Sequence, residues 1–115
     1  MRFSSVAIDL AESLPKSYAG NYVACQLIRS STSPVLNYGE AQAAESRNDF
    51  IHKMKICLRD LRETYVCLQL IKLKKWTPNE AIDPVFWENN ELFSVFVSSL
   101  KTAQFRGKTL PTSKF

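Results

Sequence analysis

The sequence predicts an all-α protein folded as an up-and-down four-helix bundle. Apolar residues recur every three to four positions in four separate segments, which is the period of an amphipathic helix. Prolines or turn-forming residues lie between neighbouring segments, and no segment alternates in the manner of a half-buried strand. Because short connections favour antiparallel neighbours, we expect residues 1–105 to form the bundle and residues 106–115 to be a flexible C-terminal tail.

The first helix is expected over residues 2–14. Pro15 should end it, because a residue that precedes a proline is disfavoured in the helical region. Its apolar face follows the i, i+3, i+4, i+7 pattern of a helix with one buried side. That face comprises Phe3, Val6, Ala7, Leu10, Ala11 and Leu14.

The second helix is expected over residues 18–44, and its surface is sharply divided. Pro34 lies inside it and should produce a kink near residues 30–33, where serine and threonine hydroxyls would bond the freed carbonyls. One stripe about 80° wide is entirely polar at about 100° per residue. The stripe is either a solvated face or a hydrogen-bonding seam with another helix or subunit. It contains Gln26, Arg29, Ser33, Asn37 and Glu40.

The third helix is expected over residues 46–75, with Ser46 as its N-cap. Its first half has one apolar stripe, but its second half carries apolar side chains nearly all round. Such a helix is buried on every side, which predicts a subunit interface beyond the bundle itself. The alternative is a helix end that the following loop covers with Trp76 and Trp87. The predicted interface residues are Val66, Cys67, Leu70 and Ile71.

The fourth helix is expected over residues 84–104. The preceding linker, residues 77–84, contains two prolines, and Pro84 suits the first position of a helix. Apolar residues line one side of the predicted helix, with Glu88 and Glu91 on the other. This segment therefore completes the bundle.

Charge is distributed unevenly along the chain. Residues 47–76 contain eight basic and three acidic groups, net +5, whereas residues 77–100 contain four acidic and no basic groups, net −4. A basic helical surface is the kind that binds RNA or DNA backbones, although charged outer faces are also usual in bundles. The candidate nucleic-acid-binding residues are Lys55, Arg59 and Arg62, extended by Lys72, Lys74 and Lys75.

The residues of catalytic chemistry are sparse. His52 is the single histidine, and the helical wheel points it away from the apolar stripe that contains Cys57. Three cysteines without a CxxC pair fit neither a disulfide framework nor a zinc site, and we expect them to pack as small apolar residues. We therefore expect no catalytic residue, no metal and no cofactor. Because these patterns are missing, we also expect that the protein is not an enzyme. No apolar run is long enough to span a membrane and no signal peptide is evident, so we expect a cytoplasmic protein.

Two blocks of residues resemble the 23S rRNA intervening-sequence proteins, a family of four-helix bundles whose pattern is approximately Q-x-x-R-S-x-x-S-x-x-x-N-x-x-E-G. Ala41 departs from it, standing where the family often has glycine. The first block adds Ser30 to the polar stripe, and together these residues form the family-motif polar seam: Gln26, Arg29, Ser30, Ser33, Asn37 and Glu40. The second block contains Ser46, Asp49, Phe50, Ile51, Ile56 and Glu63.

The resemblance implies a bacterial, cytoplasmic bundle that assembles into a homo-oligomer, often a ring-like pentamer. A related group, the accessory variability proteins of diversity-generating retroelements, forms basic barrels that engage nucleic acid. The leading hypothesis is therefore a non-enzymatic bundle that associates with itself and has an interaction or scaffolding role. The alternative is an RNA- or DNA-binding module that uses the basic surface of the third helix.

Overall fold

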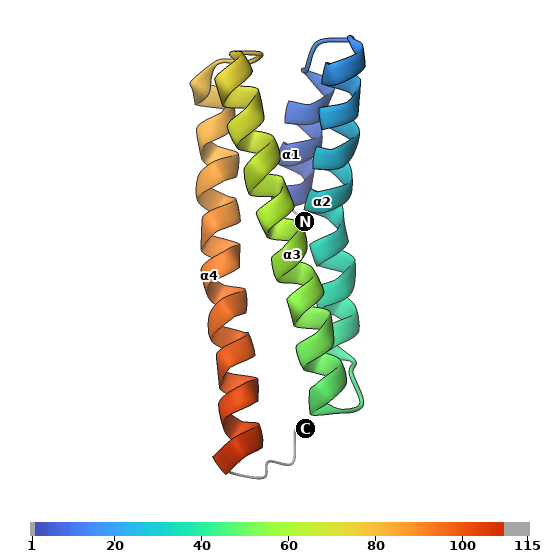
Figure 1. Cartoon of the computed structure of the whole chain (residues 1–115), viewed down its shortest axis with the longest axis vertical. Helices are drawn as coiled ribbons and strands as arrows, with labels where there is room; N and C mark the ends of the chain where they lie inside the picture. The colour runs from blue at the N-terminus through green and yellow to red at the C-terminus, as the bar shows by residue number, and fades with distance from the viewer. Residues whose placement is uncertain (1, 110–115) are drawn as a thin grey trace.

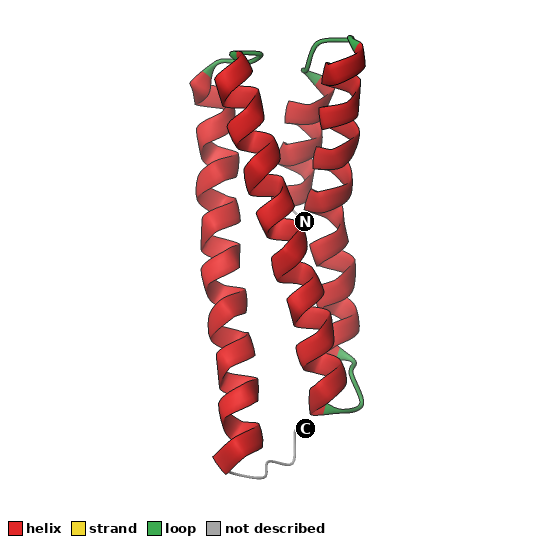
Figure 2. Cartoon of the chain, in the orientation of Figure 1, coloured by secondary structure: helices red, strands yellow, loops and turns green. Residues whose placement is uncertain are grey.

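Four helices run up and down along one axis in the computed structural model, which describes residues 2–109 (Figure 1). They are α1 (Arg2–Glu12), α2 (Tyr18–Gln42), α3 (Arg47–Lys74) and α4 (Asn79–Thr109). The connections between them are short, and the described residues contain no strand (Figure 2). The Cα trace extends 52 × 20 × 19 Å. The predicted fold class is therefore confirmed.

The helices are arranged in a cycle, so that each contacts its two neighbours. The pairs in contact are α1 with α2, α2 with α3, α3 with α4, and α4 with α1. The core lies along the axis between them, as the amphipathic patterns require. None of the described helices is long and apolar enough to cross a lipid bilayer. The largest fully buried apolar side chains are Leu27, Met54, Leu61, Leu68, Ile71, Ile82 and Val85.

Side chains fix the starts of α2 and α3. The Ser17 hydroxyl accepts a hydrogen bond from the Gly20 amide at 3.1 Å, and the Ser46 hydroxyl accepts one from the Asp49 amide at the same distance. Each satisfies an amide that has no partner within its helix. The Ser46 N-cap is therefore confirmed. At the other end of α3, Lys75 adopts the left-handed conformation with φ 54° and caps the helix through its own amide.

The start of α4 was predicted wrongly. The helix begins at Asn79 rather than at residue 84, and Pro84 lies inside it. Ile82 is fully buried and Val85 is 1% exposed, so the additional turn places Ile82 in the core. This burial outweighs the backbone bond that Pro84 cannot make. The linker is accordingly shorter than the sequence suggested.

The end of α4 also differs from the prediction. The helix continues to Thr109, past the expected end at residue 104, so residues 106–109 of the predicted flexible tail are helical. Gly107 costs a helix only about 1 kcal/mol relative to alanine, which does not by itself end it. The rest of the predicted tail, residues 110–115, lies outside the described residues.

Smaller differences occur in α1 and α2. Each helix ends two residues earlier than predicted, at Glu12 and Gln42. α2 is continuous through Pro34. Pro34 leaves the Ser30 carbonyl without its helical donor, and the neighbouring hydroxyls bond other carbonyls. Thr32, for example, donates to the Ile28 carbonyl, two residues before Ser30, at 2.8 Å.

α1 is the shortest helix and lies beside only the upper part of α2 in Figure 1. A buried bond from the Ser4 hydroxyl to the Ser31 carbonyl, 2.7 Å long, joins the start of α1 to the middle of α2. Beyond this level the fourth corner of the bundle has no described helix. There the rings of Tyr38 on α2 and Phe96 on α4 stack with their centroids 5.1 Å apart.

Candidate functional site

Arg29 connects α2 to α3 through charged contacts. Its guanidinium pairs with Glu63 on α3, and its Nη1 lies 3.5 Å from the Asp60 Oδ1. It also donates to the Gln26 side-chain oxygen at 3.2 Å. The hydrogen bond to Glu63 is the main reason that the pKa of Arg29 is raised above its ordinary value. Arg29 is therefore held as a cation against two carboxylates of the neighbouring helix.

Asp60 is a fully buried carboxylate at this interface. Its Oδ1 is 3.5 Å from Arg29 and 4.0 Å from the Arg59 Nε, whereas its Oδ2 has no hydrogen-bond partner within the described part of the chain. A buried charge is tolerated only when a partner compensates for its lost hydration. Asp60 therefore depends chiefly on Arg29.

A second buried polar contact lies one turn further along. The hydroxyls of Ser30 and Thr64 are 2.7 Å apart, and both residues are completely inaccessible to solvent. The sequence analysis did not predict that Asp60 and Thr64 are buried. The sequence did contain a signal for their burial, because positions 60 and 64 share one face of α3 with the apolar positions 57, 61 and 68.

The lower part of the polar seam contacts α3 through one ion pair. Glu40 and the ammonium of Lys53 are 2.6 Å apart, and this hydrogen bond is the main cause that raises the pKa of Lys53. Asn37 instead donates within α2, to the Ser33 carbonyl and hydroxyl at 3.1 and 3.0 Å. Of the six predicted seam residues, the structure joins Arg29, Ser30 and Glu40 to α3, and gives the other three contacts within α2.

Three of the predicted nucleic-acid-binding residues share one exposed stripe of α3. Lys55, Arg59 and Arg62 are all exposed and follow the spacing of one helical face. The Arg62 guanidinium carbon lies 5.3 Å from the centroid of the Phe93 ring, a cation–π contact. Their charges therefore remain accessible from solvent.

The other three basic residues do not extend this stripe. At about 100° per residue, Lys72 and Lys74 project about 100° to either side of the stripe, and Lys75 lies beyond the helix as its left-handed C-cap. Lys72 is paired with Asp83 at 2.9 Å and lies 5.4 Å from the centroid of the Phe86 ring. The six residues accordingly do not form one continuous basic patch.

The cysteines differ in their environments. Cys57 and Cys67 are buried, and burial is the main cause that raises the pKa of both thiols, that of Cys57 to about 11. A thiol kept protonated in this way is a poor nucleophile. Cys25 is exposed, so the prediction that all three cysteines pack inside was wrong for this one. His52 is exposed, and no group of metal-ligating side chains was found among the described residues.

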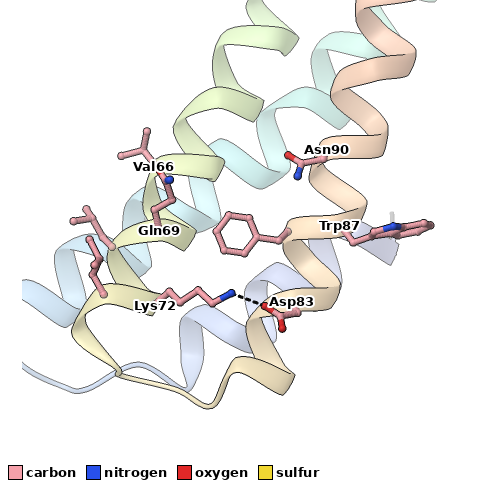
Figure 3. Close-up of a pocket in the computed structure, with 9 residues that line it drawn as sticks. Val66, Gln69, Lys72, Asp83, Trp87 and Asn90 are labelled. Atoms are coloured by element: carbon pink, nitrogen blue, oxygen red, sulfur yellow. Dashed lines mark hydrogen bonds and ion pairs between the residues drawn. The ribbon is translucent and has the colours of Figure 1, made fainter.

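An apolar groove runs along the outer surface between α3 and α4. It has a volume of about 750 Å³. Val66 and Gln69 of α3 and Trp87 and Asn90 of α4 are among the residues that line it, and in Figure 3 the Trp87 ring projects from the side of α4 that faces away from α3. The Lys72–Asp83 ion pair bridges α3 and α4 at the end of the groove nearest the loop between them. A second hollow of about 370 Å³ shares three of its residues and continues it along α3 and α4, away from the Lys72–Asp83 ion pair. The exposed apolar residues in the groove are Val66 (53%), Leu70 (44%), Leu73 (78%) and Trp87 (66%).

The predicted interface requires a correction at two positions. Cys67 is 8% exposed and Ile71 is fully buried, because α3 turns these side chains towards the core of its own bundle. Val66 and Leu70 are exposed as expected. Trp87 was proposed as a cover for this end of α3 but is itself two-thirds exposed, so the apolar surface stays open.

Comparison with protein families identifies the chain. The model of the 23S rRNA-intervening sequence protein family matches residues 1–97. The protein belongs to this family. The match covers α1, α2 and α3 entirely and more than half of α4.

A solved structure supports the same relationship. A protein of unknown function from the S23 ribosomal protein family of Bacteroides thetaiotaomicron is similar, with a TM-score of 0.80 and 28% sequence identity. The match covers 87% of this chain and 93% of the other. No curated protein matches the chain significantly.

The resemblance to the intervening-sequence family is carried by residues that lie apart from the groove. In this family member Arg29 and Glu63, which come from the two blocks of the pattern, pair with one another across α2 and α3. Phe50 from the second block is buried in the core. The residues that line the groove belong to neither block.

Proposed function

We propose that this protein is a non-enzymatic bundle that associates with itself through the groove between α3 and α4, and that its role is interaction or scaffolding. The observation that carries the proposal is the set of four exposed apolar side chains that line one groove. Contiguous exposed apolar surface is characteristic of sites that other molecules cover. Burying a large aromatic residue such as Trp87 is typical of the energetic centre of an interface.

The polar seam has a different role in this proposal. Arg29, Ser30 and Glu40 fix the packing of α3 on α2 through Glu63, Thr64 and Lys53. This packing sets the orientation of α3, and α3 in turn provides one wall of the groove. The seam therefore supports assembly without taking part in it.

The test is the mass of the protein in solution. Light scattering at tens of micromolar should give a multiple of the 13.1 kDa chain mass. The same measurement gives the number of copies, which the family resemblance suggests is often five. A clean monomer mass at this concentration would refute the proposal.

A matched pair of leucines tests whether the groove between α3 and α4 is the surface of self-association. Leu73 in the groove and Leu36 on α2 are exposed to similar extents, 78% and 70%. Leu73→Ser should reduce the mass at a given concentration, whereas Leu36→Ser should leave it unchanged. If the two variants behave alike, the groove is not the interface.

A second candidate function, nucleic-acid binding, is favoured by the exposed stripe of Lys55, Arg59 and Arg62. Such binding would weaken steeply between low and physiological salt, because each phosphate contact releases counterions. Charge reversal at Arg59 and Arg62 should weaken RNA or DNA binding in a gel-shift titration. Affinity that does not change with salt or with these variants would exclude this function.

A further inference from the structure

A separate cavity lies where the first turn of α1 meets α2 and α4. It has a volume of about 430 Å³. Volumes of this size are typical of pockets that hold small molecules. The residues that line it come from these three helices, and none of them lines the groove between α3 and α4. The cavity is therefore distinct from the surface proposed for self-association.

Apolar side chains form most of the walls of this cavity. The rings of Tyr38 and Phe96 stack with 4° between their planes, and the buried Phe96 holds this stack in place. Tyr38 and Val95 nevertheless remain open to solvent, with 38% and 60% of their surface exposed. A ligand that covers them needs an apolar body, and an aromatic ring is favoured because it also gains from the ring already there.

Two side chains of opposite charge line the same cavity, Arg2 from α1 and Glu88 from α4. Arg2 is exposed and Glu88 is partly buried. Neither forms an ion pair with any residue that the structure describes. In the groove, by contrast, Lys72 and Asp83 neutralise each other at 2.9 Å. The cavity therefore presents a cation and an anion that are both free to pair with a ligand.

The two charges define the polar end of such a ligand. A carboxylate forms two parallel hydrogen bonds with an arginine, and an ammonium pairs with a glutamate. A ligand of one sign leaves either Arg2 or Glu88 without a partner. A zwitterion placed between the two helices satisfies both side chains.

We propose that this cavity binds a free amino acid with an aromatic side chain. The carboxylate of the ligand pairs with the Arg2 guanidinium, and its ammonium pairs with the Glu88 carboxylate. Its ring packs against Val95 and the stack of Tyr38 on Phe96. The bound molecule joins α1 to α4, and no residue of the groove takes part. The site is thus independent of the proposed self-association.

Isothermal titration calorimetry with three probes tests the chemistry of the ligand. L-Phenylalanine carries both charges, whereas 3-phenylpropionate lacks the ammonium and phenethylamine lacks the carboxylate. Phenylalanine should bind at least about tenfold more tightly than either analogue, because each analogue leaves one charged side chain of the cavity unpaired. Absence of phenylalanine binding would overturn the proposal, and so would equal affinities for phenylalanine and one of the analogues.

Two neutral variants test the assigned contacts. Arg2→Gln should lower the affinity for phenylalanine to about that for phenethylamine, and Glu88→Gln should lower it to about that for 3-phenylpropionate. Both variants should fold normally, because neither side chain has an ion-pair partner in the described part of the chain. Lys16→Gln and Glu91→Gln remove the same charges at exposed positions outside the cavity and should bind phenylalanine as the native protein does. Native affinity in both cavity variants, or equal losses in the controls, would contradict the assignment.

Nuclear magnetic resonance locates the bound probe. Phenylalanine should shift the backbone amide signals of Tyr38 and Val95, whereas the indole signal of Trp87 in the groove should stay in place. A shift at Trp87 without one at Tyr38 would place the ligand in the groove and overturn the proposal. Neither result depends on whether the protein self-associates, so the two proposals fail separately.

Discussion

The two flanks of α3 are closed in different ways. On the side of α2, polar groups are paired directly, the buried Ser30 with Thr64 and the half-exposed Arg29 with Glu63. On the side of α4, the surface opens into a groove with Val66 and Trp87 exposed. Removing one partner of a buried polar contact leaves the other partner unpaired, which lowers the free energy of unfolding. Truncating an exposed apolar side chain changes the free energy of unfolding little, unless a partner molecule covers that side chain. The α2 flank should therefore determine stability, and the α4 flank association.

Arg29→Ala should produce the largest change on the α2 flank. We expect a loss of about 3 kcal/mol in the free energy of unfolding, because the variant leaves the buried Asp60 carboxylate without its main cationic partner. Chemical denaturation measures the loss. The double variant Arg29→Ala with Asp60→Asn should recover part of it. A loss of less than about 1 kcal/mol would show that Arg29 behaves as an ordinary surface ion-pair residue.

Ser30→Ala should have a smaller effect on the same flank. It leaves the Thr64 hydroxyl buried without a partner, which costs about 1–2 kcal/mol. Adding Thr64→Val removes the orphaned group as well. The double variant should be more stable than Ser30→Ala alone, as thermal and chemical denaturation would both show. Equal stability of the two variants would mean that the hydroxyl pair is not coupled.

Cys57 should make the protein less stable in alkali. The pKa of its thiol is raised from 9.0 to about 11 in the folded chain, so the unfolded chain loses this proton first as the pH rises. The free energy of unfolding should therefore fall by about 1 kcal/mol between pH 9 and 10 from this group, with no contribution below pH 8. Cys57→Ala should show a smaller decline over this interval. An identical decline in both proteins would contradict the assignment.

Trp87→Ala should change stability least. The side chain is already two-thirds exposed, so we expect the free energy of unfolding to stay within about 0.5 kcal/mol. The measurement is made at a protein concentration below that of self-association, because assembly would add to the apparent stability. Leu61→Ala, at a fully buried position of α3, is the contrasting control. A large loss in the free energy of unfolding for Trp87→Ala would show that the α4 flank also determines stability, and the two flanks would not differ in this respect.

The fold was predictable from the sequence because apolar spacing, the Ser46 N-cap and prolines act locally. The start of α4 was not, because the burial of Ile82 against other helices overrode the local preference of Pro84. The helical wheel identified Val66 and Leu70 as surplus apolar surface. It did not separate them from Cys67 and Ile71, because their burial depends on where α4 and the core lie. The pairing of Arg29 with α3 likewise requires the relative positions of two helices.

The short α1 has a consequence for local opening of the bundle. Its eleven residues pack against only the upper part of α2, so the lower part of the rod is closed by three helices and the Tyr38–Phe96 stack. Backbone amides there are protected by fewer packed neighbours and should exchange with deuterium sooner. Amides near residues 39–44 should open through local fraying, whereas those near Leu27 and Leu68 should exchange only through global unfolding. We therefore expect the end of the bundle that contains α1 to resist local unfolding, and the opposite end to unfold locally first.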